Sequence, residues 1–321
     1  MFIPFVVLFI TTCISSASHV SLPYHYNGGF FTVNLTRQDS GARFEAQASL
    51  ELSMTRNFLV SSGPRRYPDE YFDLSSISIG DDAFVVMFDD EDPVSFVTEN
   101  PRESRGPHLQ VSFSPESPIA GQVQNFLIAP SDNDQIGVLH MNPPNPRSFA
   151  LNGEIYYTEN TLHASWEDMF GASSGWGVRA AVGLSTDVTQ DFQFSPCMIG
   201  SVSPILNVPE SIVDQIVREI EGANLRTTRH GDGSIFVHNV NDASFASFPS
   251  LHFTIPTTDG QLIHILTIEP HEYFGPTDDS GVRKLLLYPS EELILSREFF
   301  RKMVVHFDVQ NNRVGFGEPL L

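Results

Sequence analysis

Short runs of apolar residues, many of them alternating with polar ones, recur along most of the chain. Alternation with a period of two is typical of half-buried strands, and short continuous apolar runs are typical of buried ones. Clusters of Pro, Gly, Asp, Asn and Ser, which favour turns, separate these runs. The pattern predicts a mainly β protein without the strand–helix alternation of a parallel α/β sheet. The predicted strands are FFTVNL (30–35), FEAQASLELS (44–53), AFVVMF (83–88), HLQVSF (108–113), GVRAAVGLS (177–185), SIFVHNV (234–240), SLHFTI (250–255), IHILTI (263–268), RKLLLY (283–288) and VVHFDV (304–309).

Helical periodicity is confined to two places. Segment 209–222 carries apolar residues at helical spacing, with Pro209 at its start and Gly222 at its end, which predicts a helix between them. A second, shorter helix is predicted at 296–303, with Ser296 as its N-cap. The residues that follow predict a hairpin whose Asn-rich turn tolerates a positive φ.

The N-terminus has the pattern of a secretory signal peptide. Residues 2–14 are mostly apolar and small residues follow them, so we expect residues 1–18 to be removed by cleavage after Ala17 or Ser18. The mature chain is then expected to be secreted, or to reach the lumen of the secretory or lysosomal pathway. The apolar run is too short to span a bilayer comfortably, so no membrane association is expected after cleavage. Cleavage would leave Cys197 as a small buried apolar residue, and the sequon at Asn34 is a predicted glycosylation site.

The charge balance is strongly acidic. The 321 residues include 39 Asp and Glu but only 18 Lys and Arg, which gives a formal net charge of −21. A clustered basic surface is therefore not available for nucleic acid or anionic lipid. The 11 histidines lack the spacing of metal ligands, and two cysteines are too few for a cysteine-rich zinc site, so we expect no metal and no cofactor. His306 lies in an apolar run and is expected to be a hydrogen-bonded core or interface residue.

The most specific motif lies near the C-terminus. Residues 293–317 read LILSREFFRKMVVHFDVQNNRVGFG. The chain resembles the pepsin-like aspartic proteases here, because that family closes on I-L-G-x-x-F-[LM]-R…F-D…N-N-R-[IV]-G-F-A; Ser296 stands where the family has Gly. Weaker matches follow the family's order: 27–35 resembles its first strand, 44–62 its catalytic strand and loop, 134–141 its D-G-I-L-G-L-G segment, and 176–185 the strand that opens its second lobe.

The resemblance implies a mainly β, bilobal pepsin-like fold. The two lobes would comprise residues 19–170 and 171–321, with a peptide-binding cleft between them. A peptide or protein segment would be the ligand of that cleft, and the chain is expected to be a monomer.

The two positions that match the family's catalytic aspartates carry no carboxylate. The family's first loop reads D-T-G-S and the second D-T-G-[ST], which places Leu52 and Gly200 at the catalytic positions. The family's chemistry needs two carboxylates that share one proton, so that one acts as base and the other as acid. Leucine cannot exchange a proton and glycine has no side chain.

The hydroxyl residues of both loops are retained. Ser53 and Ser201 each follow a catalytic position, and Thr55 and Ser203 stand two residues further on. The family's loop glycines, which permit close backbone approach, are here Met54 and Val202. The flap of the family would correspond to 83–96 with Phe88 near its Tyr; an ordinary acidic hairpin is the equal alternative.

Two D-S-G tripeptides offer other candidates for the catalytic pair. Asp39 and Asp279 each begin one, but both lie among polar turn residues rather than at the end of an apolar strand. Asp279 also lies after the helix and strands that should follow the second aspartate. Both are therefore interpreted as turns.

These features predict a secreted pepsin-like protein without its catalytic dyad and without peptidase activity. The alternatives are an active aspartic endopeptidase with displaced carboxylates, and a structural or antigenic secreted β protein with no cleft ligand.

Overall fold

The computed structural model describes most of the chain from residue 19 onwards. The described residues are 19–26, 29–37, 43–52, 58–60, 72–79, 84–86, 108–115, 117, 121–133, 136–161, 175–184, 194–200, 206–240, 245, 247–291, 293–295 and 297–320. No helix among them is long and apolar enough to cross a bilayer.

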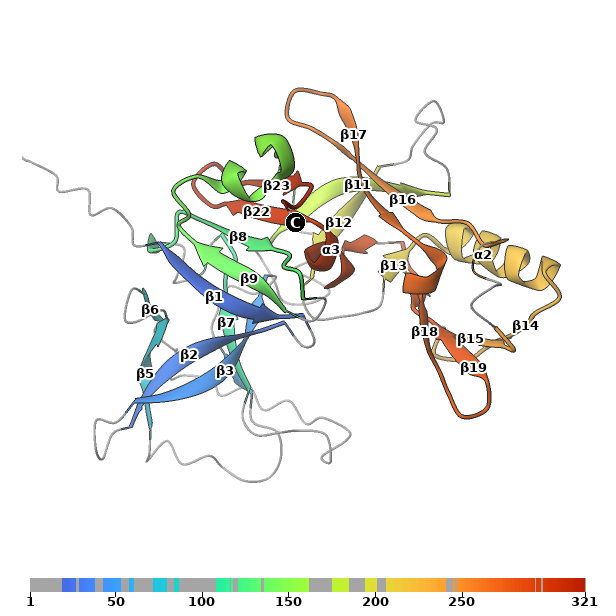
Figure 1. Cartoon of the computed structure of the whole chain (residues 1–321), viewed down its shortest axis with the longest axis horizontal. Helices are drawn as coiled ribbons and strands as arrows, with labels where there is room; N and C mark the ends of the chain where they lie inside the picture. Colours follow the sequence, from blue (N-terminus) through green and yellow to red (C-terminus); the bar gives the residue numbers. More distant parts are fainter. Residues whose placement is uncertain are drawn as a thin grey trace, which may run out of the picture.

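The largest sheet joins strands from both ends of the chain (Figure 1). Ten strands follow one another across it, and a two-stranded branch leaves from β2. In spatial order the ten are β10 (Tyr156–Glu159), β23 (Arg313–Gly317), β22 (Val304–Asp308), β8 (Asn125–Ala129), β9 (Ile136–Met141), β1 (Val20–His25), β2 (Phe30–Arg37), β3 (Arg43–Glu51), β7 (His108–Ser112) and β4 (Phe58–Val60). The branch consists of β5 (Phe72–Ile79) and β6 (Phe84–Val86).

The second half of the chain contributes two smaller sheets. A seven-stranded sheet runs β17 (Leu262–Ile268), β16 (Leu251–Pro256), β11 (Gly177–Gly183), β12 (Ser195–Ile199), β21 (Leu293–Leu295), β13 (Leu206–Val208) and β20 (Leu287–Pro289). A four-stranded sheet runs β14 (Arg226–Arg229), β15 (Ile235–His238), β19 (Val282–Leu285) and β18 (Phe274–Thr277). The run 283–288, expected as one strand, is divided between β19 and β20, which pair in different sheets.

Both predicted helices are present. Helix α2 (Glu210–Gly222) has Pro209 as its N-cap and buries Val213, Ile216 and Ile220, so the apolar face lies against the protein as expected. Helix α3 (Arg297–Lys302) leads into the predicted β22–β23 hairpin, and Asn312 in its turn has φ 49°. Ser296, the predicted N-cap of α3, lies outside the described residues.

A cluster of aromatic rings occupies the core where strands of both halves meet. The rings of Phe126 and Phe307 stack with centroids 4.5 Å apart, and Trp176 packs edge-on against Phe307 at 5.2 Å. Phe113 lies 5.0 Å from Phe126. All four side chains are at most 1% exposed. Because such rings bury much apolar surface and prefer these geometries, they fix β7, β8, β22 and the start of β11 together.

Truncation of the buried face of α2 should destabilise the protein. Ile216 is fully buried, so Ile216→Ala should lower the free energy of unfolding by about 2–5 kcal/mol, through lost burial and the cavity left behind. Glu219→Ala, on the exposed face of the same helix, is the control and should change it by less than about 0.5 kcal/mol. Urea denaturation measures both; equal effects would contradict the assigned helix face.

Candidate functional site

Leu52 and Gly200 occupy equivalent places in two sheets. Leu52 directly follows β3, which pairs in parallel with β7, and Gly200 directly follows β12, which pairs in parallel with β21. Most other neighbouring strands of these sheets are antiparallel. Leu52 and Gly200 therefore each stand at the end of a strand that has a parallel neighbour.

Trp176 joins the two strand ends. Its backbone N–H donates to Leu52 O at 3.0 Å, and its own carbonyl accepts from the Ile199 N–H at 2.9 Å. Its indole Nε1–H donates to Phe113 O at 2.7 Å. The sequence pattern places this residue only at the start of a strand. In the structure it binds Leu52 and Ile199, the residue before Gly200.

Neither position offers a proton-transfer group. The Leu52 side chain is apolar and 1% exposed, within the core. Gly200 is held by its N–H, which donates to Leu295 O at 2.9 Å. A Cβ built on Gly200 would meet Ile294 Cγ2 at 3.4 Å and Leu295 O at 4.0 Å, which is ordinary van der Waals contact. Packing of the described residues therefore admits a Cβ at this position.

Asn160 holds the segment that carries Trp176. Its Nδ2 donates to Gly175 O at 3.1 Å and its Oδ1 accepts from the Gly177 N–H at 2.9 Å. The same Nδ2 donates to Asn312 Oδ1 at 2.9 Å, in the turn of the β22–β23 hairpin. One amide side chain thus connects the C-terminal hairpin to the residues flanking Trp176. The sequence gives no signal for this role beyond an isolated Asn.

Several predicted site residues lie outside the described part of the chain. These are the loop hydroxyls Ser53, Thr55, Ser201 and Ser203, and Phe88 of the expected flap. Asn34 lies in β2, half-buried, with strand partners on both sides, and its glycosylation stays a prediction. The boundary near residue 170 and the leader 1–18 fall on residues that are not described, so these divisions also stay predictions.

The tripeptide that begins at Asp279 forms a turn, as expected. The Gly281 N–H donates to Asp278 O at 3.0 Å between β18 and β19, and Asp279 is exposed. Hydrogen bonds from the Val282 and Ser280 N–H groups to the Asp278 carboxylate lower its pKa. Asp278 and Asp279 are therefore turn residues. Asp39, in the other tripeptide, is not described.

Two histidines are buried and neutral. His306 is 3% exposed: its Nδ1 lies 2.9 Å from the Tyr157 hydroxyl and its Nε2 3.2 Å from Asn125 Oδ1, which confirms a satisfied core histidine. Because Asn125 Oδ1 can only accept, Nε2 carries the proton and Nδ1 accepts from Tyr157. Burial lowers the pKa of His306 to about 4. Burial, with His19 nearby, also lowers the pKa of His140 to about 4.

Cys197 is a small buried residue, as predicted. It is 2% exposed and forms no disulfide among the described residues. Burial raises the pKa of its thiol, which keeps it protonated and unreactive.

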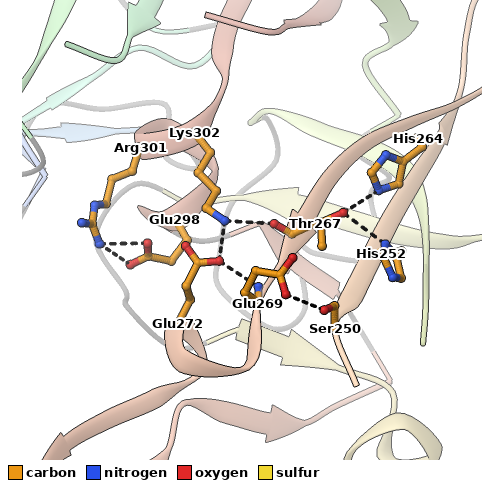
Figure 2. A network of polar contacts seen from close by, with 9 residues as sticks. All are labelled: Ser250, His252, His264, Thr267, Glu269, Glu272, Glu298, Arg301 and Lys302. Carbon is orange, nitrogen blue, oxygen red and sulfur yellow. Dashed lines mark hydrogen bonds and ion pairs between the residues drawn. The ribbon is translucent and has the colours of Figure 1, made fainter. Parts of the chain in front are cut away.

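A polar network that the sequence did not reveal lies on β16, β17 and the end of α3 (Figure 2). His252 Nδ1 and His264 Nε2 both lie 3.1 Å from Thr267 Oγ1. A β-bulge in β17 allows both histidines to reach the same hydroxyl. Phe253 of β16 pairs with Leu266, but the next residue, Thr254, pairs with His264, so β17 has one extra residue, Ile265, at this point. The extra residue places His264 and Thr267 on one face although they are three apart in sequence.

The same network anchors β17 to the end of α3 (Figure 2). Lys302 Nζ donates to Thr267 O at 3.0 Å and pairs with Glu272, which also accepts from the Glu269 N–H at 2.8 Å. Glu269 in turn accepts from the Ser250 hydroxyl at 2.6 Å. Within the described ranges no three His, Cys, Asp or Glu side chains are grouped so as to hold a metal ion.

Comparison with known proteins identifies the fold. No protein-family model matches the sequence, and no curated protein matches it. The structure is similar to that of an aspartic proteinase from Irpex lacteus, with a TM-score of 0.62, covering 94% of this chain and 98% of that one at 10% sequence identity. The fold is that of a pepsin-like aspartic proteinase. The expected fold class is thereby confirmed, and at this identity the likeness says nothing of activity.

Replacement of Trp176 tests the hydrogen bond of its indole. Trp176→Phe removes the indole N–H and leaves the buried Phe113 carbonyl without this donor, so the free energy of unfolding should fall by about 1–3 kcal/mol. Chemical denaturation monitored by circular dichroism measures it. An unchanged midpoint would show that this hydrogen bond contributes nothing to the fold.

Acid should destabilise the protein through His140 and His306. Their folded-state pKa values of about 4 lie below the ordinary 6.5, so the stabilisation is complete above pH 6.5 and is lost as the pH falls towards 4. Each of the two histidines should lower the free energy of unfolding at pH 4 by up to about 3 kcal/mol relative to neutral pH.

Denaturation at several pH values between 7.5 and 4 measures this loss, and His306→Gln should flatten the slope. His271→Gln, at an exposed position, is the control and should leave the slope unchanged. A slope that is the same in both variants would contradict the role of His306.

Proposed function

We propose that this chain is a secreted, non-catalytic protein with a pepsin-like fold that binds a peptide or protein segment in the cleft between its lobes. The observation that carries the proposal is the pair Leu52 and Gly200, which follow equivalent parallel-paired strands whose ends Trp176 joins. Secretion is supported by the leader-like residues 1–18.

A non-catalytic role follows from the chemistry of the residues at positions 52 and 200. Aspartic protease chemistry divides acid and base roles between two neighbouring carboxylates, whose mutual repulsion separates their pKa values. A buried leucine and a glycine supply neither role. Peptide binding requires only a groove and backbone contacts, so a cleft can keep its ligand after the acids are lost. That last step rests on analogy of fold.

The expected acid sensitivity is consistent with the same proposal. A working dyad of this kind needs one carboxyl to stay protonated, which favours acidic conditions. Burial lowers the pKa values of His140 and His306 to about 4, which predicts a loss of stability in that range.

An activity assay tests the absence of peptidase function. The purified protein should release no peptides from denatured casein between pH 4 and 7, with or without pepstatin, under conditions where circular dichroism shows it folded. Pepsin at pH 4 is the positive control. Cleavage that pepstatin inhibits would establish the alternative of an active endopeptidase with displaced carboxylates.

Restoration of the family's loop residues tests the assigned positions. The variant Leu52→Asp, Met54→Gly, Gly200→Asp, Val202→Gly should gain pepstatin-sensitive activity, since a Cβ at Gly200 has room. The matched control changes Leu52 and Gly200 to Asn, which cannot share a proton as the acids do. Equal inactivity of two folded variants, with no pepstatin binding by either, would overturn the placement.

A further inference from the structure

A pocket of about 270 Å³ opens between the edges of two sheets. Its floor consists of Ile265, Met303 and Phe316, which are 8%, 7% and 1% exposed. Tyr156 from β10 and Leu151 from the 3-10 helix Leu151–Gly153 stand at its rim. None of its lining residues is Leu52, Trp176 or Gly200, so this site is separate from the strand ends described above.

Two exposed large apolar side chains line this pocket, and two more lie close to its lining residues in the sequence. Among the described residues five large apolar side chains are exposed: Leu151, Tyr156, Leu262, Tyr288 and Leu320. Leu151 and Tyr156 line the pocket, and Leu262 precedes its lining residue Ile263. Leu320 follows two residues after the lining residue Glu318, and the Leu151 N–H donates to Glu318 O at 2.8 Å. Clustered exposure of this kind marks interaction sites more often than scattered single residues do.

The fifth exposed residue, Tyr288, belongs to β20 at the opposite edge of the seven-stranded sheet from β17. Its exposed fraction, 41%, is close to the 38% of Tyr156. It therefore offers a matched comparison for Tyr156.

Two carboxylates line the pocket. Glu154 and Glu318 are the acidic lining residues, His264 is the one basic type among them, and Lys and Arg do not line it. The Tyr156 hydroxyl donates to Glu154 Oε2 at 3.1 Å, which places one carboxylate beside the exposed ring. A ligand that complements this lining carries apolar side chains together with positive charge.

The backbone beside the pocket belongs to edge strands. Strand β17 ends the seven-stranded sheet and β10 ends the largest sheet in the described part of the fold. Both strands line the pocket, and the Thr258 N–H, in the turn between β16 and β17, donates to Tyr157 O at 2.8 Å. Towards the other end of β17, Thr267 O accepts from Lys302, which Glu272 holds in place (Figure 2). Residues 263–265 of β17 line the pocket, so this is the part of the edge strand that a bound segment would meet.

We propose that this site binds an extended segment of a partner protein in which apolar residues alternate with Lys or Arg. An apolar side chain would fill the pocket above Ile265, Met303 and Phe316, and a neighbouring cation would pair with Glu154 or Glu318. Backbone hydrogen bonds to β17 would add the segment as a strand, as in other proteins that bind peptides at a sheet edge. This site is additional to the proposed cleft and does not depend on it.

A peptide-binding experiment tests this site in the full-length mature chain. The probe is an acetylated, amidated heptapeptide of alternating Lys and Leu, measured by fluorescence anisotropy at low salt. The same peptide with Glu in place of Lys should bind at least about tenfold more weakly, because it repels the carboxylates. No binding of the Lys peptide, or equal binding of both peptides, would overturn the proposal.

Two matched pairs of variants separate this site from general attraction to an acidic protein. Tyr156→Ala and the double variant Glu154→Gln, Glu318→Gln should each weaken binding by about tenfold or more. Tyr288→Ala should leave it unchanged, and so should Glu219→Gln with Glu291→Gln, which removes the same charge at other exposed positions. Equal losses in a variant and its control would overturn the proposal.

A second copy of the chain is the competing occupant. Light scattering after size-exclusion chromatography measures it. The chain would self-associate at this site if it formed a dimer that Leu262→Asp converts to a monomer and that the Lys–Leu peptide does not dissociate. That result would contradict the proposed partner.

Discussion

The backbone of Trp176 is the point on which the two halves of this protein depend. Its N–H and carbonyl bind Leu52 and Ile199, from strands that belong to different sheets, and its ring lies in the aromatic core with Phe126 and Phe307. Backbone hydrogen bonds in a buried place are hard to replace, because an unpaired group there is costly. The geometry of the two strand ends is thus set by main chain and by packing. Neither of these two hydrogen bonds uses a side chain of Leu52 or Ile199.

The sequence predicted much of the fold because its strands and turns follow local rules. Alternation and turn residues located about half of the strands, and the apolar face with Pro209 and Gly222 located α2. The C-terminal motif supplied the arrangement, which alternation alone could not. The division of 283–288 between β19 and β20 was missed, because a continuous apolar run contains no signal that its residues change sheets.

The site was predictable only in part. Leu52 and Gly200 each follow a strand, as the motif predicts, and their match to the catalytic positions stays a prediction. Trp176, Asn160 and the His252–Thr267–His264 cluster could not be predicted, because their contacts join residues distant in sequence or depend on a bulge of one residue. A bulge leaves no mark in hydrophobic periodicity, although it decides which side chains share a face. Long-range geometry of this kind needs the fold itself.

The position of the C-terminal hairpin has a consequence for synthesis of the chain. Strand β22 pairs with β8, so one edge of β8 is filled only by residues 304–308, and β23 then separates β22 from β10. A ribosome must therefore complete nearly the whole chain before strands made much earlier find their partners. Until then β8 and β10 present open edges, which are prone to pair with other chains. Residues 304–317 thus determine when these two edges are covered, and a product truncated before them would be prone to aggregate.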